Sequence, residues 1–300
     1  MDLNALAGCL ASAACLVTQS TSGLIVGLLL FLVAAGLTLI FGVLKVVNLA
    51  HGTFYMLGAY LALSAYQLTG SYLAAVAAGC LGMALFGIVF ERFLISRVYG
   101  TNVLMQLLVC YAVVLIFDDV VKMVWGADFQ AMGMPPAFQV PPLFVAGGVV
   151  PPFYLVLIGV ALAIALLLGL SLAATRAGKI VRAAAHNPAM VSALGINTTL
   201  LYTLVFAAGG ALAGLAGGLA APVRSLTPGM GFSVLIESFI VTVIGGMGSI
   251  AGALIAAVVL GLIRSFGTIG FPLFTDELIY LFMIVILVAR PSGLFGREVV

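Results

Sequence analysis

Long stretches without any charged residue are the feature that most constrains this chain. Four such stretches, without Asp, Glu, Lys or Arg, are Val46–Phe90, Val98–Phe117, Phe129–Thr175 and Ser238–Ile263. About 20 apolar residues carry a helix across the hydrocarbon core of a bilayer, so several stretches are long enough for two crossings. A soluble domain carries about 25% charged residues, whereas this chain carries 7%. The sequence therefore predicts an all-α, polytopic transmembrane helix bundle.

Breaks at Gly, Pro and charged residues divide the chain into about nine predicted spans, within a range of about eight to ten. The predicted spans are 23–44, 48–68, 72–90, 103–124, 152–174, 199–221, 232–247, 250–267 and 273–289. The seventh and eighth are short and nearly meet at Gly245-Gly246-Met247-Gly248-Ser249. This junction is compatible with two short helices or with one interrupted, re-entrant element.

The basic residues predict the orientation of the chain, because cytoplasmic loops are enriched in Lys and Arg. Those that fall in alternate connections are Lys45, Arg92, Arg97, Arg176, Lys179, Arg182, Arg290 and Arg297. The connection 125–150 has no basic residue and contains two Pro-Pro pairs. This alternation predicts an N-terminus outside the cell and a cytoplasmic C-terminus. Arg224 and Arg264 break the rule, since both fall on the external side.

The first 22 residues differ from the rest of the chain. Their apolar stretch is short for a span and is similar to the core of a signal peptide, but residues 1–4 lack Lys and Arg. We predict an extracytoplasmic or signal-like segment, 1–22, followed by a single transmembrane domain, 23–296. The cysteines lie in apolar stretches without a Cys-x-x-Cys pair, and we predict that all are buried and unpaired: Cys9, Cys15, Cys80 and Cys110.

The segment 41–62 places polar residues inside an apolar stretch. Asn48 and His51 are three residues apart and share a helix face, with Gly52 beside them. Such groups need partners in hydrocarbon, so they are candidates for lining a solute path. Alternatively, Asn48 caps the helix and His51 bonds a neighbouring carbonyl. Gly248 is a further path candidate, because the sequence around it weakly repeats that around Gly52, as in transporters with duplicated halves.

A basic segment, 175–197, follows the fifth predicted span. Its basic residues are spaced by 3, 3 and 4 and lie on one helix face: Arg176, Lys179, Arg182 and His186. Asn187-Pro188 predicts a helix end and restart, and Gly195 fits a second helix end. Two short helices outside the membrane suit a docking surface for a cytoplasmic partner. An ordinary positive-inside loop is the alternative.

Few other residues suggest chemistry. Gly210, Gly214 and Gly218 recur every four residues, which predicts close helix packing. Asp118 and Lys122 are spaced to form an ion pair, and Glu237 lies about a turn and a half inside its span, so we predict structural roles for these charges.

Missing motifs exclude several activities. The sequence contains no G-x-x-x-x-G-K-[ST] phosphate loop, no H-E-x-x-H and no G-x-S-x-G, and its two histidines are 135 positions apart. We therefore predict that the chain is not an enzyme and that it holds no cofactor or metal. The basic residues mark span ends instead of one basic face, so no nucleic-acid partner is expected.

Four ordered motifs resemble one family. They are VVNLAHGTFYMLGAYLA (46–62), RAAAHNPAMVSALGIN (182–197), IGGMGSIAGALIAAVVLGL (244–262) and RPSGLFG (290–296). Together they are similar to the LivH/LivM-type permeases, the membrane subunits of branched-chain amino-acid ABC importers. The smaller LivH-like branch fits better, and the resemblance covers nearly the whole chain.

The resemblance implies more than the spacing does. Such a permease lies in the bacterial inner membrane among lipid, with a second, LivM-like permease subunit, two cytoplasmic ATPase subunits that bind ATP, and an extracytoplasmic solute-binding protein. The segment 175–197 would then contain the ATPase-coupling helices, with Arg182 and Gly195 at matching positions. Relatives handle leucine-type amino acids, amides or urea. A stand-alone channel or facilitator is the alternative function.

Overall fold

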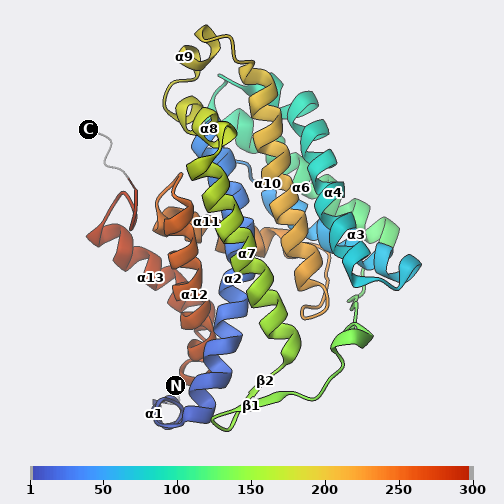
Figure 1. Ribbon diagram of the computed structural model, residues 1–300, viewed down its shortest axis with the longest axis vertical. Helices are drawn as coiled ribbons and strands as arrows, with labels where there is room; N and C mark the ends of the chain where they lie inside the picture. The colour runs from blue at the N-terminus through green and yellow to red at the C-terminus, as the bar shows by residue number, and fades with distance from the viewer. Residues whose placement is uncertain (1–2, 297–300) are drawn as a thin grey trace.

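The computed structural model describes residues 3–296 and is an elongated bundle of helices (Figure 1). In this part of the chain the α-helices are α1 (Leu3–Ala11), α2 (Ala13–Leu44), α3 (His51–Thr69), α4 (Tyr72–Phe90), α5 (Ser96–Val98), α6 (Val103–Trp125), α7 (Pro152–Ala174), α8 (Arg176–His186), α9 (Pro188–Ala193), α10 (Thr198–Ala220), α11 (Met230–Gly245), α12 (Ile250–Gly270) and α13 (Thr275–Ala289). A π-helical turn, η1 (Glu91–Ile95), follows α4, and a 3-10 turn, η2 (Pro136–Phe138), lies in the long connection after α6. Two short antiparallel strands complete the fold, β1 (Leu143–Val145) and β2 (Gly148–Val150).

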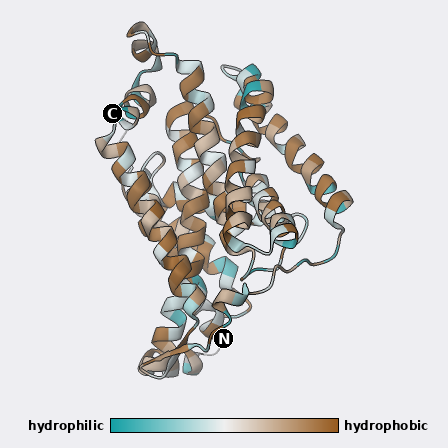
Figure 2. Ribbon diagram, turned by 45° about the vertical axis from the view of Figure 1, so that its right-hand side comes forward, coloured by the Kyte–Doolittle hydropathy of each residue, from teal (hydrophilic) through white to brown (hydrophobic). Residues whose placement is uncertain are grey.

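The predicted all-α membrane fold is confirmed, but the predicted count of about nine spans is not. Six helical stretches are long and apolar enough to cross a membrane: Ala13–Leu44, Tyr72–Val98, Val103–Trp125, Pro152–Ala174, Thr198–Ala220 and Ile250–Gly270. The other three predicted spans are helical but fall short. α11 has 16 residues and α13 has 15, below the roughly 20 that a crossing needs. α3 begins with a polar turn and is less apolar. Figure 2 shows apolar residues along most of the helix lengths.

α2 is the central helix of the bundle. It packs against α7, α10, α11 and α12, and nearly all of its residues between Ile25 and Ile40 are buried. It begins ten residues before the predicted span 23–44, because the Ser12 side chain caps its N-terminus and accepts from Cys15 N at 3.4 Å. Part of the predicted signal-like segment 1–22 is therefore the first turns of this helix.

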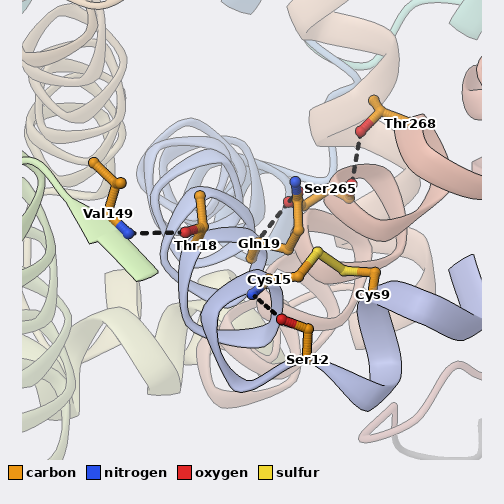
Figure 3. The surroundings of a disulfide bond; sticks show 8 residues. All are labelled: Cys9, Ser12, Cys15, Thr18, Gln19, Val149, Ser265 and Thr268. Atoms are coloured by element: carbon orange, nitrogen blue, oxygen red, sulfur yellow. Dashed lines mark hydrogen bonds between the residues drawn. A yellow bond between two sulfur atoms is a disulfide. The ribbon is translucent and has the colours of Figure 1, made fainter. Parts of the chain in front are cut away.

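The prediction of four unpaired cysteines was wrong for two of them. Cys9 and Cys15 form a disulfide with Cα atoms 5.1 Å apart, while Cys80 and Cys110 are free. Six residues along one continuous helix would separate these cysteines by about 9 Å. The break at Ser12 turns the chain sharply, so that α1 crosses the start of α2 and the two cysteines come together (Figures 1 and 3).

This disulfide lies where three elements meet, at a pole that we call the hairpin end because β1 and β2 lie there (Figure 3). The Thr18 hydroxyl accepts from Val149 N of β2 at 3.0 Å. The Ser265 hydroxyl, on α12, bonds the Gln19 side-chain oxygen at 2.6 Å. These contacts fix the start of α2 to the hairpin and to α12.

A group of glycines, which we call the glycine seam, joins α3, α4 and α10. Its members are Gly58, Gly79 and Gly214. A Cβ atom at Gly214 would collide with the backbone of Gly79, and one at Gly58 would collide with Gly214. Hydrogen as the side chain lets the three backbones touch, as the predicted small-residue ladder requires.

α11 and α12 are two helices joined by a tight turn at the predicted break. The turn between them uses Gly246 and Gly248, whose φ angles are 95° and 90°. The backbone of Gly252 then packs directly on that of Gly245. The C-terminal segment covers this turn, since Leu294 N donates to Ile244 O at 2.8 Å. Arg297, used in the orientation argument, lies outside the described residues.

Candidate functional site

The helices α8 and α9 lie beyond the end of α7, at the pole opposite the hairpin end (Figure 1). We call this pole the α8 end. The Thr175 hydroxyl caps α8, accepting from Gly178 N at 3.0 Å. Asn187 ends α8 and caps α9, with its side chain accepting from Met190 N at 3.0 Å, and Pro188 is the first residue of α9. Gly195 has φ of 82° after the end of α9. The helix restart at Asn187-Pro188 is thus present as the sequence predicts.

The predicted basic face of α8 divides into two kinds of residue. Arg176, Lys179 and His186 are exposed. Arg182 is also exposed, but its guanidinium donates to the carbonyl oxygens of Leu172 and Ala173. These carbonyls lie at the C-terminal end of α7, where helix oxygens lack intrahelical partners and a cation is stabilising. Arg182 therefore fixes the angle between α7 and α8.

The opposite side of α8 anchors it to the bundle. Its buried Ala184, together with Val191 of α9, packs against Leu39 and Val43 of α2 and Val205 of α10. Met190, on α9, and Leu194, just after it, are 63% and 74% exposed. The α8 end thus presents both cations and uncovered apolar side chains on a firmly held support.

The predicted path residues Asn48, His51 and Gly52 lie where α3 begins. Asn48 and His51 are completely buried. The Asn48 side-chain oxygen accepts from Ala50 N at 3.0 Å, and His51 Nε2 donates to the Val33 carbonyl of α2 at 3.0 Å. His51 thus bonds a neighbouring carbonyl, as the alternative interpretation predicts, whereas Asn48 does not cap the helix, because the N-cap of α3 is Ala50 and no side chain caps it.

Several buried polar atoms at the start of α3 and on α11 have no partner within residues 3–296. Asn48 Nδ2, His51 Nδ1, Thr53 Oγ1 and Ser238 Oγ have no hydrogen-bond partner among the described residues. Gly52 lies backbone to backbone with Gly231, so the first turns of α3 and α11 meet. Buried polar groups are normally paired, and interrupted helices with such groups often mark solute sites in transporters.

Gly248 lies apart from the start of α3. The nearest atom that a Cβ at Gly248 would meet is the Cα of Gly42, on α2, at 3.8 Å. Between the two sites α2 and α11 share a polar contact, in which Thr38 and Thr242 hydroxyls are 3.2 Å apart. His51, Gly52 and Gly248 therefore each contact α2 or α11.

A charged cavity lies between α2, α3, α7 and α11, towards the hairpin end. Its volume is about 160 Å³, and its lining combines apolar α2 residues with Tyr55, Arg224 and Glu237. Glu237 Oε1 bonds Arg264 Nη1 at 2.6 Å, and Arg264 lies 3.4 Å from Asp276. The Arg224 guanidinium interacts with the Tyr55 hydroxyl. Four charges from α11, α12, α13 and the α10–α11 loop thus gather in one place.

Sequence reasoning did not identify this cavity. Arg224 and Arg264 were the two basic residues that broke the orientation rule, and Glu237 was predicted to be structural. Their conflict with the expected topology, in a chain with so few charges, was the available signal. The predicted pair of Asp118 and Lys122 was wrong, because Lys122 bonds Asp119 instead, at 2.8 Å.

A second buried carboxylate also went unnoticed. Glu91 is completely buried at the start of η1. It accepts from the Tyr99 hydroxyl at 2.8 Å and from the Thr203 hydroxyl of α10 at 2.7 Å. This network connects the end of α4 to the start of α10 near the α8 end. No group of three or more His, Cys, Asp or Glu within residues 3–296 is arranged to hold a metal ion.

Comparison with known proteins decides the class. Residues 20–289 match the family described as "Branched-chain amino acid transport system / permease component". The chain belongs to this permease family. The high-affinity branched-chain amino acid transport system permease protein BraD of Pseudomonas aeruginosa is 32% identical over 296 residues, covering 93% of this chain and 95% of the relative.

More distant permeases align over the same length. The corresponding permease protein LivH of Escherichia coli is 27% identical and covers 93% of this chain and 95% of the relative. A probable permease protein LivH of Methanocaldococcus jannaschii is 29% identical and covers 90% of this chain and 89% of the relative. No solved structure matches this permease. Since the relatives are transport permeases, the predicted LivH-type family and the prediction of a multi-pass transport protein that is not an enzyme are confirmed.

Proposed function

We propose that this permease is the membrane-spanning subunit of an ATP-binding-cassette importer in the bacterial inner membrane. Its solute is a small polar molecule, a branched-chain amino acid or a related amide or urea. The relatives are permease proteins of branched-chain amino acid transport systems, which supports this solute class. The sequence has no phosphate-binding loop, so ATP binds to partner subunits.

The arrangement of α8 and α9 is the observation that carries this proposal. The exposed cations Arg176 and Lys179 of α8 and the exposed apolar side chains Met190 and Leu194 of the following segment all lie at the α8 end of the bundle. An apolar patch rimmed by charge is typical of a protein–protein contact. We assign this surface to one of two cytoplasmic ATPase subunits, and the second ATPase subunit to the other member of a permease pair.

The remaining residues of the coupling segment give that surface its shape. Arg182 bonds the end of α7, and Asn187 with Pro188 sets the angle between α8 and α9. Gly195 supports the left-handed turn that leads into α10, a conformation that favours glycine. His186 completes the basic face. A movement of the ATPases would therefore be transmitted to α7 and α10.

The orientation follows from the charges and the disulfide. Lys45 ends α2, which packs on α8, and Arg92 lies in η1 beside α10, so both belong to the basic α8 end. We propose that this end is cytoplasmic and that the hairpin end faces outward, where disulfides such as Cys9–Cys15 form. A solute-binding protein would dock there, and a LivM-like permease would pair within the bilayer. Residues 23–296 then form one permease domain.

Cross-linking tests the coupling surface. In a chain whose Cys80 and Cys110 are replaced by Ala, Met190→Cys carries a thiol-reactive photo-cross-linker, and Phe144→Cys is the matched control, since Phe144 is 72% exposed on the hairpin. Met190→Cys is expected to cross-link the co-expressed ATPase subunits and Phe144→Cys is not. Equal cross-linking at both positions, or ATPases that never co-purify with the chain, would refute the proposal.

A further inference from the structure

The charged cavity near the hairpin end has two chemically different walls. The apolar wall comes from α2 and α11 and includes Ile25, Leu29, Val33 and Val234. The polar wall holds Tyr55, Arg224 and Glu237. A cavity of this kind offers a small ligand both an aliphatic surface and fixed charges, which is the usual composition of a small-molecule site.

Arg224 is a cation without an ion pair. Among the described residues no carboxylate lies within 4.0 Å of its guanidinium, although every other charged group of the cluster has a partner at that distance. It contacts the Tyr55 hydroxyl and experiences the charge of Glu237 from further away. A half-buried guanidinium in a membrane protein is costly to leave uncompensated. Its planar set of donors matches a carboxylate.

Glu237 complements Arg224 on the same wall. Its Oε1 atom accepts a hydrogen bond from Arg264 Nη1 at 2.6 Å. Its Oε2 atom accepts no hydrogen bond from any described residue. Arg264 is itself shared with Asp276, so it neutralises Glu237 incompletely. One oxygen of Glu237 thus remains available to a cationic donor in the cavity.

We infer that the charged cavity binds a small aliphatic zwitterion, with the ligand carboxylate on Arg224 and Tyr55 and its ammonium on Glu237 Oε2. The aliphatic side chain then contacts Ile25 and Leu29. The volume of about 160 Å³ suits a small ligand, since an engineered cavity of about 150 Å³ in another protein holds benzene. This inference rests on the proposed function and narrows its solute: a neutral amide or urea would leave Arg224 uncompensated.

Ligand protection of a cysteine tests the site without any partner subunit. Ser22 lines the cavity, so Ser22→Cys, in the full chain lacking Cys80 and Cys110 and held in lipid nanodiscs, reacts with the neutral reagent methyl methanethiosulfonate. Saturating L-leucine is expected to slow this reaction about tenfold. Isovalerate lacks the ammonium, isopentylamine lacks the carboxylate and urea lacks both charges, so none should protect at the same concentration.

Variants assign the two charges. Arg224→Gln is expected to weaken leucine protection about tenfold to 100-fold, since a charge-assisted pair is lost, and Arg224→Lys to restore part of it. Lys122→Gln removes an exposed cation of α6 outside the cavity and serves as the control. The comparison of leucine with isovalerate, isopentylamine and urea uses no variant at Arg224. It therefore tests the inference even if the Arg224→Gln chain misfolds.

Three outcomes would overturn the inference. They are no protection by leucine in Ser22→Cys, equal protection by urea or isovalerate, and undiminished protection in a folded Arg224→Gln chain. Failure here together with ATP-driven leucine uptake by the assembled importer would leave the proposed function standing. Protection by leucine without ATPase association would support the ligand site and refute the proposed function.

Discussion

The glycine seam and the charged cavity show two opposite solutions for packing helices in a membrane. In the seam, Gly58, Gly79 and Gly214 remove side chains so that α3, α4 and α10 touch through their backbones. In the cavity, α2, α3, α7 and α11 stay apart, and the space is lined by Tyr55 and charged side chains. Close packing holds helices together in lipid, where apolar burial adds little.

The difference separates the part of the bundle that is fixed from the part that can hold a solute. The seam has no room for a ligand, and any added atom meets backbone. The α2–α11 side retains polar atoms without partners, such as His51 Nδ1 and Ser238 Oγ. We therefore expect substitutions in the seam to affect stability most, and substitutions around the cavity to affect recognition together with a smaller loss of stability.

The largest effect is expected in the seam. Gly214→Ala forces a Cβ into the backbone of Gly79 and should lower the free energy of unfolding by about 3 kcal/mol. Gly159→Ala is the control, because a Cβ at Gly159, on α7, meets nothing within 4 Å. Unfolding in mixed detergent micelles measures both. Equal stability of the two variants would show that the seam is not closely packed.

Breaking the ion pair beside the cavity should have a smaller effect. Glu237→Gln leaves Arg264 with only the exposed Asp276, 3.4 Å away, and is expected to cost about 2 kcal/mol of unfolding free energy. The double variant Glu237→Gln, Arg264→Gln removes both charges and should recover part of that loss. A double variant that is less stable than Glu237→Gln alone would contradict this prediction.

The Glu91 network provides an intermediate case with charge but no cavity. Burial and the bond to Glu91 raise the pKa of Tyr99, so its phenol stays protonated and donates at neutral pH. Glu91→Gln keeps an acceptor oxygen but loses the charge, and we expect a loss of about 1 kcal/mol. The same unfolding assay tests it, and a stabilised variant would show that the buried carboxylate is kept for another reason.

The smallest effect concerns the polar contact between α2 and α11. A double-mutant cycle of Thr38→Val and Thr242→Val should give a coupling energy of about 0.6 kcal/mol, the average for interhelical hydrogen bonds in membranes. A coupling as large as the effect of Gly214→Ala would mean that polar contacts, and not close packing, hold this side together.

Local sequence rules predicted the elements of this fold well. The uncharged runs located the helices, and Asn187-Pro188 located the break between α8 and α9, because both signals lie within a few consecutive residues. The count of about nine spans is not confirmed where apolar character and length disagree, because α11 and α13 are apolar but have only 16 and 15 residues. The Cys9–Cys15 bond depends on a sharp turn of the chain at Ser12, which composition does not reveal.

The candidate site also has a part that the sequence predicts and a part that depends on contacts between distant elements. The basic face of α8 follows from helical spacing, whereas the bond from Arg182 to the end of α7 depends on how two helices meet. The charged cavity brings Arg224, Glu237 and Arg264 together from different elements, and Tyr55 comes from nearly 170 positions earlier than Arg224. Spacing along one helix cannot predict such a combination.

Energy coupling distinguishes an importer subunit from a facilitator, and uptake into proteoliposomes measures it. The chain is reconstituted alone, and also with its second permease and ATPase subunits, and entry of radiolabelled L-leucine delivered by the solute-binding protein is followed with and without ATP. We predict accumulation only in the complete assembly with ATP. Leucine flux through liposomes that contain this chain alone, unchanged by ATP, would contradict the account and favour a stand-alone facilitator.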